Sequence, residues 1–188
     1  MAEQTIHIKN MVCDRCIRAV QRELEQQGYA VRHIELGKAT VEREQIDLPG
    51  IEALLEEQGF GLLTDRNLRL VNQVKTLIID LIGKGDVATM NVTLSNYLAE
   101  QVGMEYAYLS HLFSTIEHLT IEKFWILQRV EKAKEWLSYD ELSISEIARR
   151  LGYSSVAYLT NQFRQITGLT PAAYRKQAAS DRNPLDWI

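Results

Sequence analysis

Cysteine is scarce in this sequence, and long apolar runs are missing. Only two of the 188 residues are cysteine, at positions 13 and 16, which argues against a secreted disulfide framework and predicts a reducing, cytoplasmic setting. No stretch approaches the ~18 uninterrupted apolar residues of a membrane span, and the N-terminus lacks the apolar run of a signal peptide. We therefore expect no contact with a membrane.

The usual catalytic groupings are missing as well. The chain has no glycine-rich phosphate loop, no nucleophile elbow and no Ser-His-Asp set. Glu56 and Glu57 fall on the exposed face of a predicted helix, without a nucleophile or histidine beside them. The four histidines, at positions 7, 33, 111 and 118, form no pair with the spacing of metal ligands. We expect a protein that is not an enzyme.

The sequence does contain a strong helical pattern between positions 143 and 176. Apolar residues at helical spacing predict a helix that is capped by Ser143 or Ser145 and ends at Gly152. A short turn leads to a second helix from about Ser155 to Gly168. Its inward residues are Leu159, Phe163 and Ile166. Two short helices with a tight turn are typical of a DNA-binding helix-turn-helix, although an ordinary helical hairpin has the same spacing.

An internal repeat favours the helix-turn-helix. Residues 98–103 read LAEQVG and residues 147–152 read IARRLG, and each copy continues to a Tyr-Leu pair, a Phe and an Ile-x-x-Leu-Thr ending. A helix predicted over residues 121–137 joins the copies. The chain therefore carries two helix-turn-helix units.

This tandem resembles the DNA-binding domain of the AraC/XylS family of bacterial transcription regulators over residues 71–177. The resemblance rests on the two repeated turns, on Arg129-Val130-Glu131 in the linking helix and on the closing Gly168-Leu169-Thr170-Pro171. It implies that two recognition helices enter successive major-groove segments of double-stranded DNA. By position, the base-facing candidates of the first unit are Ala107, Ser110 and His111. The outward residues of the second are Ser155, Val156, Ala157, Thr160, Asn161 and Arg164.

Charge distinguishes the two units. The net charge is −4, but residues 142–177 contain an excess of positive side chains, among them Arg149 and Arg150, which are candidates for phosphate contacts. Residues 94–120 contain glutamates and no Lys or Arg. We expect the second unit to anchor on phosphate, the first to contribute weakly, and the affinity to be modest and salt-sensitive. Two units let a monomer span adjacent groove segments, so a homodimer is compatible with binding but not required.

Residues 1–65 have a different pattern, which predicts a small α/β domain. Short alternating strands, two amphipathic helices and a hairpin about Gly37 follow the order strand, helix, strand, strand, helix, strand. That βαββαβ order is the split, ferredoxin-like arrangement. We therefore predict an α+β chain: domain 1–65, a short linker at 66–70, an all-α domain of two helix-turn-helix units joined by a linking helix at 71–177, and a tail at 178–188.

The first domain resembles the heavy-metal-associated domain of copper chaperones and copper-transporting ATPases. The resemblance rests on the βαββαβ order with Met11, Cys13 and Cys16 at the first strand-to-helix junction, on the Gly37 hairpin and on Gly59-Phe60. It departs from that family at Asn10, where the family usually has glycine, and in the turn at residues 27–31. The resemblance implies that Cys13 and Cys16 bind a metal ion, with Met11 as a weak or indirect ligand.

The chemistry of the two thiols leaves several interpretations open. Thiolates suit Cu(I), Zn(II) and related soft ions, and two of them suffice for near-linear Cu(I), whereas tetrahedral zinc needs further ligands. A thiol redox sensor, or a domain that binds no metal and serves dimerisation or a protein contact, fits the same residues. We favour a DNA-binding regulator whose first domain senses Cu(I). The alternatives are a regulator with a redox or dimerisation domain, and a metal chaperone whose helices mediate protein contacts.

Overall fold

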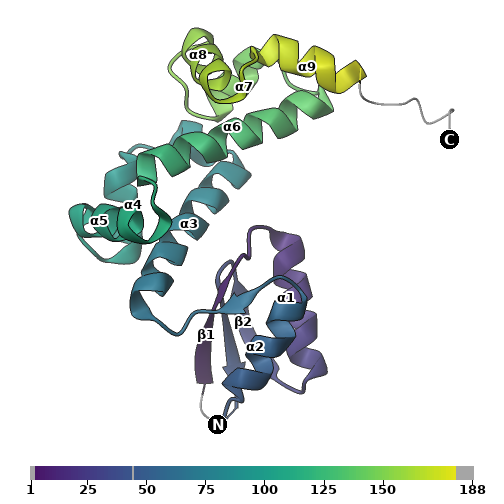
Figure 1. Cartoon of the computed structure of the whole chain (residues 1–188), viewed down its shortest axis with the longest axis vertical. Coiled ribbons are helices and arrows are strands. Elements are labelled where there is room, and N and C mark those ends of the chain that lie inside the picture. The colour runs from purple at the N-terminus through teal and green to yellow at the C-terminus, as the bar shows by residue number, and fades with distance from the viewer. Residues whose placement is uncertain (1–2, 44, 181–188) are drawn as a thin grey trace, which may run out of the picture. The chain divides into compact units, whose positions relative to one another are not determined.

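The computed structural model describes residues 3–43 and 45–180 (Figure 1). The chain divides into two compact units. Unit 1 comprises Met1–Asp80 and Leu94–His118, and unit 2 comprises Leu81–Thr93 and Leu119–Ile188. The first helix-turn-helix thus falls in the same unit as the α/β domain. The domain boundaries predicted from the sequence stay a prediction.

The N-terminal part of unit 1 is a four-stranded antiparallel sheet with two helices. Its elements follow in the order β1 (Glu3–Lys9), α1 (Asp14–Gln26), β2 (Ala30–Glu35), β3 (Lys38–Glu42), α2 (Leu48–Glu57) and β4 (Gly61–Leu62). The sheet order is β2-β3-β1-β4, with Ile6 of β1 opposite Ala39 of β3. The strand and helix order is the one that the sequence predicts.

One face of this sheet carries the core. Alternation along β1 buries Ile6 and Ile8, while Thr5 faces the other way and its hydroxyl lies 3.1 Å from that of Thr40. The helices α1 and α2 pack against each other and contribute buried apolar residues to the same core, which contains Val20, Leu24, Ile51 and Leu55.

Helix α3 (Arg66–Lys84) begins earlier than the sequence predicts. The carboxylate of Asp65 accepts hydrogen bonds from the backbone N–H groups of Asn67 (2.8 Å) and Leu68 (3.0 Å), which caps the helix. The linker expected at residues 66–70 is therefore the first turn of α3. Unit 1 is completed by α4 (Leu94–Val102) and α5 (Tyr106–Glu117), the two helices of the first helix-turn-helix.

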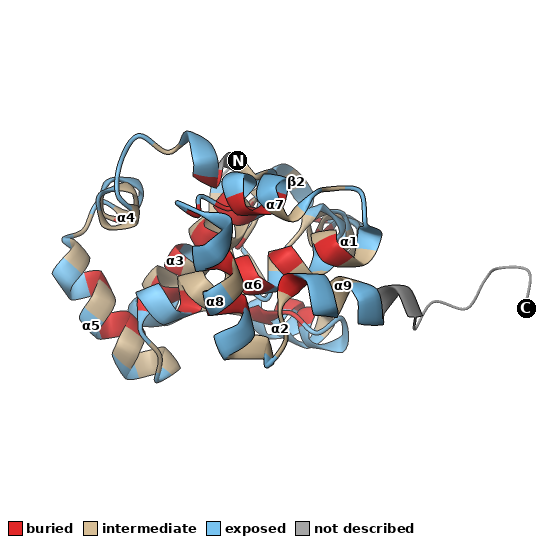
Figure 2. Cartoon of the chain, turned by 90° about the horizontal axis from the view of Figure 1, so that it is seen from above, coloured by how far each residue is buried: buried red, intermediate tan, exposed pale blue. Residues whose placement is uncertain are grey.

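Unit 2 is helical. It contains the end of α3 and then η1 (Asp86–Thr89), α6 (Ile121–Tyr139), α7 (Ile144–Arg150), α8 (Val156–Thr167) and α9 (Pro171–Ser180). The linking helix α6 packs against α7, α8 and α9. Its buried stripe, red in Figure 2, consists of Ile121, Phe124, Arg129, Val130, Ala133 and Leu137.

The C-terminal end differs in part from the prediction of a tail at residues 178–188. Residues 178–180 are the last turn of α9, and residues 181–188 lie outside the described part of the chain. Within residues 3–43 and 45–180, none of the helices combines the length and the apolar character needed to cross a bilayer.

Candidate nucleic-acid interface and thiol pair

Helix α7 opens the second helix-turn-helix with a capping box. The hydroxyl of Ser143 accepts a hydrogen bond from the Glu146 N–H (3.2 Å), and the Glu146 carboxylate accepts one from the Ser143 N–H (2.8 Å). This hydrogen bonding lowers the pKa of Glu146. Of the two serines that the sequence offers as caps, Ser143 is the cap. Gly152, at φ 69°, follows α7 in the left-handed conformation.

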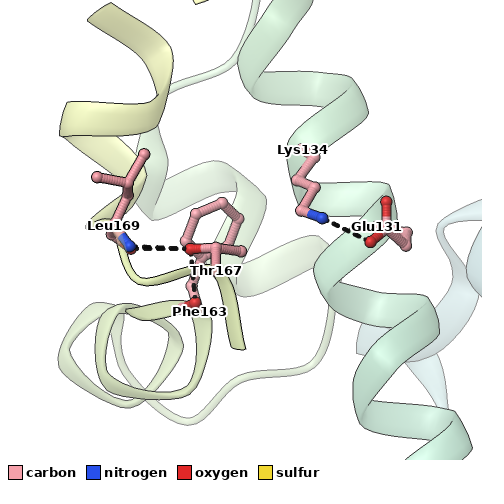
Figure 3. A network of polar contacts seen from close by, with 5 residues as sticks. All are labelled: Glu131, Lys134, Phe163, Thr167 and Leu169. Atoms are coloured by element: carbon pink, nitrogen blue, oxygen red, sulfur yellow. Dashed lines mark hydrogen bonds and ion pairs between the residues drawn. The ribbon is translucent and has the colours of Figure 1, made fainter. Parts of the chain in front are cut away.

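Helix α8 is fixed at both ends. The Ser155 hydroxyl caps its start by accepting from the Tyr158 N–H (3.1 Å). At its end the Thr167 hydroxyl lies 2.8 Å from the Phe163 carbonyl, to which it donates, and accepts from the Leu169 N–H (3.2 Å), as Figure 3 shows. Gly168 ends the helix with φ 79°. Leu159 and Phe163 are fully buried, so the opposite face is turned outward.

That outward face contains the residues predicted for DNA contact. Five of them are exposed and Thr160 is half-buried; the exposed ones are Ser155, Val156, Ala157, Asn161 and Arg164. Arg149 and Arg150 are also exposed, at the end of α7. Arg175 is engaged elsewhere, because its guanidinium donates to the Leu142 carbonyl (2.6 Å) and pairs with Asp140 (3.1 Å).

The first helix-turn-helix presents a less basic face. On α5, Ala107 and His111 are exposed and Ser110 is half-buried. At the end of α5, Glu117 pairs with Lys75 of α3 at 3.0 Å. His118 takes the left-handed conformation (φ 53°) at the position where the second helix-turn-helix has Gly168. Because an L-residue is strained in this conformation, the absence of glycine lowers the stability of the first helix-turn-helix.

The two cysteines lie together at the start of α1. Cys13 is the N-cap residue and Cys16 lies in the first turn, with 3.5 Å between their sulfurs. A hydrogen bond from the Cys16 backbone lowers the pKa of the Cys13 thiol, which favours the thiolate that binds soft metals. Two thiolates on one tetrahedral ion stand about 3.8 Å apart if each bond is about 2.3 Å. Near-linear Cu(I) would hold them about twice a bond length apart, so the two sulfurs would bind one Cu(I) after moving apart from 3.5 Å.

The surroundings of the pair limit its ligands. Met11 is only 2% exposed and belongs to the α/β core. Among residues 3–43 and 45–180, no three His, Cys, Asp or Glu side chains form a group that could hold a metal. A tetrahedral ion at this site would therefore need ligands from outside the described residues.

Asn10 is a position at which the sequence departs from the heavy-metal-associated pattern. Its φ of 69° lies in the left-handed region, which asparagine tolerates better than most residues. Its side-chain amide donates to the Gly59 carbonyl at 3.0 Å. Asparagine thus holds a left-handed backbone here, and its side chain ties the loop to the turn at Gly59.

Comparison with known proteins supports the helix-turn-helix. A family model described as a helix-turn-helix domain matches residues 98–177. Regulatory protein PocR of Salmonella typhimurium is 34% identical over 87 residues, which cover 46% of this chain and 29% of that protein. The Msm operon regulatory protein of Streptococcus mutans is 27% identical over 130 residues, 68% of this chain and 44% of that protein.

A solved structure also has the fold of this part of the chain. The C-terminal domain of AraT, a response regulator from Geobacillus stearothermophilus, superposes with a TM-score of 0.52 at 25% identity, over 66% of this chain and 94% of that one. Residues 98–177 therefore form a helix-turn-helix domain. A DNA-binding transcriptional dual regulator from Escherichia coli K-12 shares the fold, with a TM-score of 0.50 at 24% identity over 59% of this chain and 93% of that one. The chain spans less than half the length of the two curated relatives.

The helix-turn-helix domain has further features that sequence reasoning missed. A surface hollow of about 450 Å³ is lined by residues of α7, of the turn and of the first position of α8, among them Ser145, Arg149, Ser154, Ser155 and Val156. Tyr108 and Tyr158 occupy equivalent repeat positions and are 43% and 51% exposed. Large aromatic side chains exposed at matching positions of both recognition helices could have been found from the repeat itself.

The glycine after α7 is required by packing as well as by its conformation. A Cβ at Gly152 would lie 2.5 Å from Cγ1 of Val87. The equivalent residue of the first helix-turn-helix is Gly103 (φ 71°), and a Cβ there would have no atom within 4 Å. We expect Gly152→Ala to lower the free energy of unfolding by about 2–4 kcal/mol and Gly103→Ala by about 1–2 kcal/mol, measured by urea denaturation. Equal losses would show that Val87 moves aside.

Proposed function

We propose that this protein is a cytoplasmic transcription regulator that binds double-stranded DNA through its AraC-type domain. We further propose that its N-terminal α/β part is a ferredoxin-like domain of the heavy-metal-associated type, in which Cys13 and Cys16 sense a thiophilic ion, Cu(I) first. The first proposal rests on the exposed face of α8, and the second rests on the thiol pair.

The DNA proposal is supported by the side chains that α8 exposes to solvent. An exposed face with an amide and a guanidinium, Asn161 and Arg164, offers the groups that read base edges in a major groove. The exposed Arg149 and Arg150 precede it on α7, and the hollow beside them is lined by serine hydroxyls that suit a phosphate. The first helix-turn-helix has no Lys or Arg in residues 94–120, so it would contribute shape complementarity to the DNA and few ionic contacts.

The sensing proposal is supported by the fit of the thiols and by the sheet. The order β2-β3-β1-β4 with both helices on one core is the arrangement expected of a ferredoxin-like domain. Cys13 and Cys16 would hold the ion. Bound there, the ion would supply a fixed link between the loop and the first turn of α1.

A route from the thiol loop to the first helix-turn-helix lies within unit 1. The side-chain amide of Asn72 on α3 donates to the Ile8 carbonyl (3.3 Å), at the end of the strand that leads into the loop. Met11 and Val12 of the loop line a cavity of about 290 Å³ together with residues of α3 and with Ile116 and Glu117 of α5. Lys75 on α3 then binds Glu117 at 3.0 Å. Helix α3 therefore contacts both the strand that leads into the loop and the recognition helix α5.

The test is DNA affinity with and without Cu(I). A duplex is first enriched from a random-sequence library by the wild-type protein, and its affinity is then compared with that of a scrambled duplex. Preference for the enriched duplex supports the DNA proposal, and a change of that affinity on adding Cu(I) supports sensing. A ligand shifts the equilibrium only if it favours one state, so an unchanged affinity contradicts sensing while leaving the DNA proposal intact.

The Lys75–Glu117 ion pair should carry part of the coupling. We expect Lys75→Ala to keep its Cu(I) affinity and its affinity for the enriched duplex without metal, but to lose about half or more of the Cu(I)-induced change. Arg22→Ala on α1, where the removed side chain also pairs with a glutamate, is the matched control. A full response in Lys75→Ala would contradict this route without touching the sensing proposal.

One observation favours a redox sensor as the second candidate. The sulfurs, at 3.5 Å, need only a small movement to reach the ~2.05 Å of a disulfide. In that case DNA affinity would change on mild oxidation and recover with reductant, in the absence of any metal.

A further inference from the structure

Arg129 is a buried cation beneath the second helix-turn-helix. It lies on α6 and is only 8% exposed. Its guanidinium donates to two neutral acceptors, the Leu151 carbonyl (3.3 Å) and the Gln162 side-chain oxygen (3.4 Å). Burial lowers the pKa of Arg129, yet an arginine stays protonated in proteins. A full charge is therefore held by neutral acceptors under the candidate DNA-binding surface.

The two acceptors belong to the two arms of the helix-turn-helix. Leu151 follows α7 directly, and Gln162 lies on the inner face of α8, between the fully buried Leu159 and Phe163 in sequence. The planar guanidinium therefore joins the end of one helix to the middle of the next. The fork geometry of arginine suits this role, and the point charge of lysine does not.

Two aromatic rings and a hydroxyl complete the cluster. The guanidinium carbon lies 4.2 Å from the ring centroid of Tyr153 and 5.2 Å from that of Trp125. The Tyr153 hydroxyl donates to the same Gln162 oxygen at 2.7 Å. Burial raises the pKa of Tyr153, so the hydroxyl remains a donor at neutral pH. Arg129 of α6 and Tyr153 of the turn thus donate to the same side-chain oxygen, that of Gln162 on α8.

Stability alone is a poor reason for this arrangement. A buried charge without an opposite charge is costly, and apolar residues of similar volume often stabilise a core at least as well. Among the described residues, the Nε–H of Arg129 also has no hydrogen-bond acceptor. What the cluster provides is a defined geometry, because directional contacts fix α8 against the turn where apolar packing would allow it to shift.

We propose that Arg129 is a positioning residue for DNA recognition, which holds α8 at the angle that lets Asn161 and Arg164 reach base edges. This inference rests on the proposed DNA binding. Base contacts need accurate placement, whereas phosphate contacts tolerate small shifts. Disturbing the cluster should therefore reduce the preference for one sequence more than the affinity for DNA in general.

The experiment compares two duplexes, one enriched from a random library by the wild-type protein and one with its sequence scrambled. In folded Arg129→Lys we expect about tenfold weaker binding to the enriched duplex, the cost of one impaired base contact, and unchanged binding to the scrambled one. Tyr153→Phe, which loses only a hydroxyl, should lose about threefold. Arg22→Lys, on the exposed side of α1, is the control and should bind both duplexes normally.

A purely structural role predicts a different result. Loss of folded protein lowers both affinities by the same factor and leaves their ratio unchanged, so the ratio separates positioning from stability. An unchanged ratio in folded Arg129→Lys overturns the proposal, and if that variant does not fold, an unchanged ratio in Tyr153→Phe overturns it. If the wild-type protein itself shows no preference for any duplex, the proposed DNA function fails instead.

Discussion

Replacing Asn161 and Arg164 together by alanine should remove selective DNA binding. Both side chains lie on the exposed face of α8, whose other side is fixed in the core by Leu159 and Phe163, so their removal leaves the fold intact. A well-placed base contact contributes about 1–3 kcal/mol, so the double variant should bind the enriched duplex about a hundredfold or more weakly. Fluorescence anisotropy with the enriched and scrambled duplexes measures both affinities.

The single variants separate base contacts from phosphate contacts. If both residues read bases, as proposed, Arg164→Ala and Asn161→Ala should each weaken binding to the enriched duplex alone. Weaker binding of Arg164→Ala to every sequence, with a salt slope reduced by about one, would assign Arg164 to phosphate instead. Arg22→Ala removes the same charge from unit 1 and should change neither affinity. Wild-type selectivity in the double variant would contradict recognition by α8, whereas a wild-type protein that prefers no duplex would favour a chaperone whose helices contact proteins.

Local signals explain why the helix-turn-helix was predictable. A cap such as Ser143 and a left-handed glycine such as Gly168 act on residues within one helical turn, so their evidence is contained in a few consecutive letters. The start of α3 was missed although its signal is equally local. Asp65 precedes a polar stretch, and the polarity of residues 66–69 favoured a linker over a capped helix.

Features that depend on distant residues were less accessible. Arg129 appears in the sequence as part of a motif, but its burial depends on Leu151 and Gln162, the second of which is 33 positions away. A hint was present, because Arg129 is in helical register with the apolar Ala133 and Leu137. The grouping of the first helix-turn-helix with the α/β domain likewise depends on contacts between residues far apart in the chain, such as Lys75 with Glu117.

Replacing both cysteines by serine should abolish Cu(I) binding. Serine has nearly the same size but offers a hard oxygen, which a soft ion avoids. Both cysteines are half-buried, and Cys16 packs against the edge of the core. In an anaerobic titration against a competing chelator we expect the wild-type protein to bind one Cu(I) tightly and Cys13→Ser/Cys16→Ser to bind none. A thermal melt should show that the double variant is folded.

Met11→Leu is the matched control for this experiment. Because the Met11 side chain is buried in the α/β core, leucine should preserve the packing, and unchanged Cu(I) affinity would assign Met11 to the core rather than to the metal. A weaker affinity would make its thioether a ligand after movement of the loop. If the wild-type protein shows no cysteine-dependent binding of Cu(I) or Zn(II), metal sensing is wrong, and reversible oxidation of the 3.5 Å thiol pair becomes the signal to test on DNA affinity.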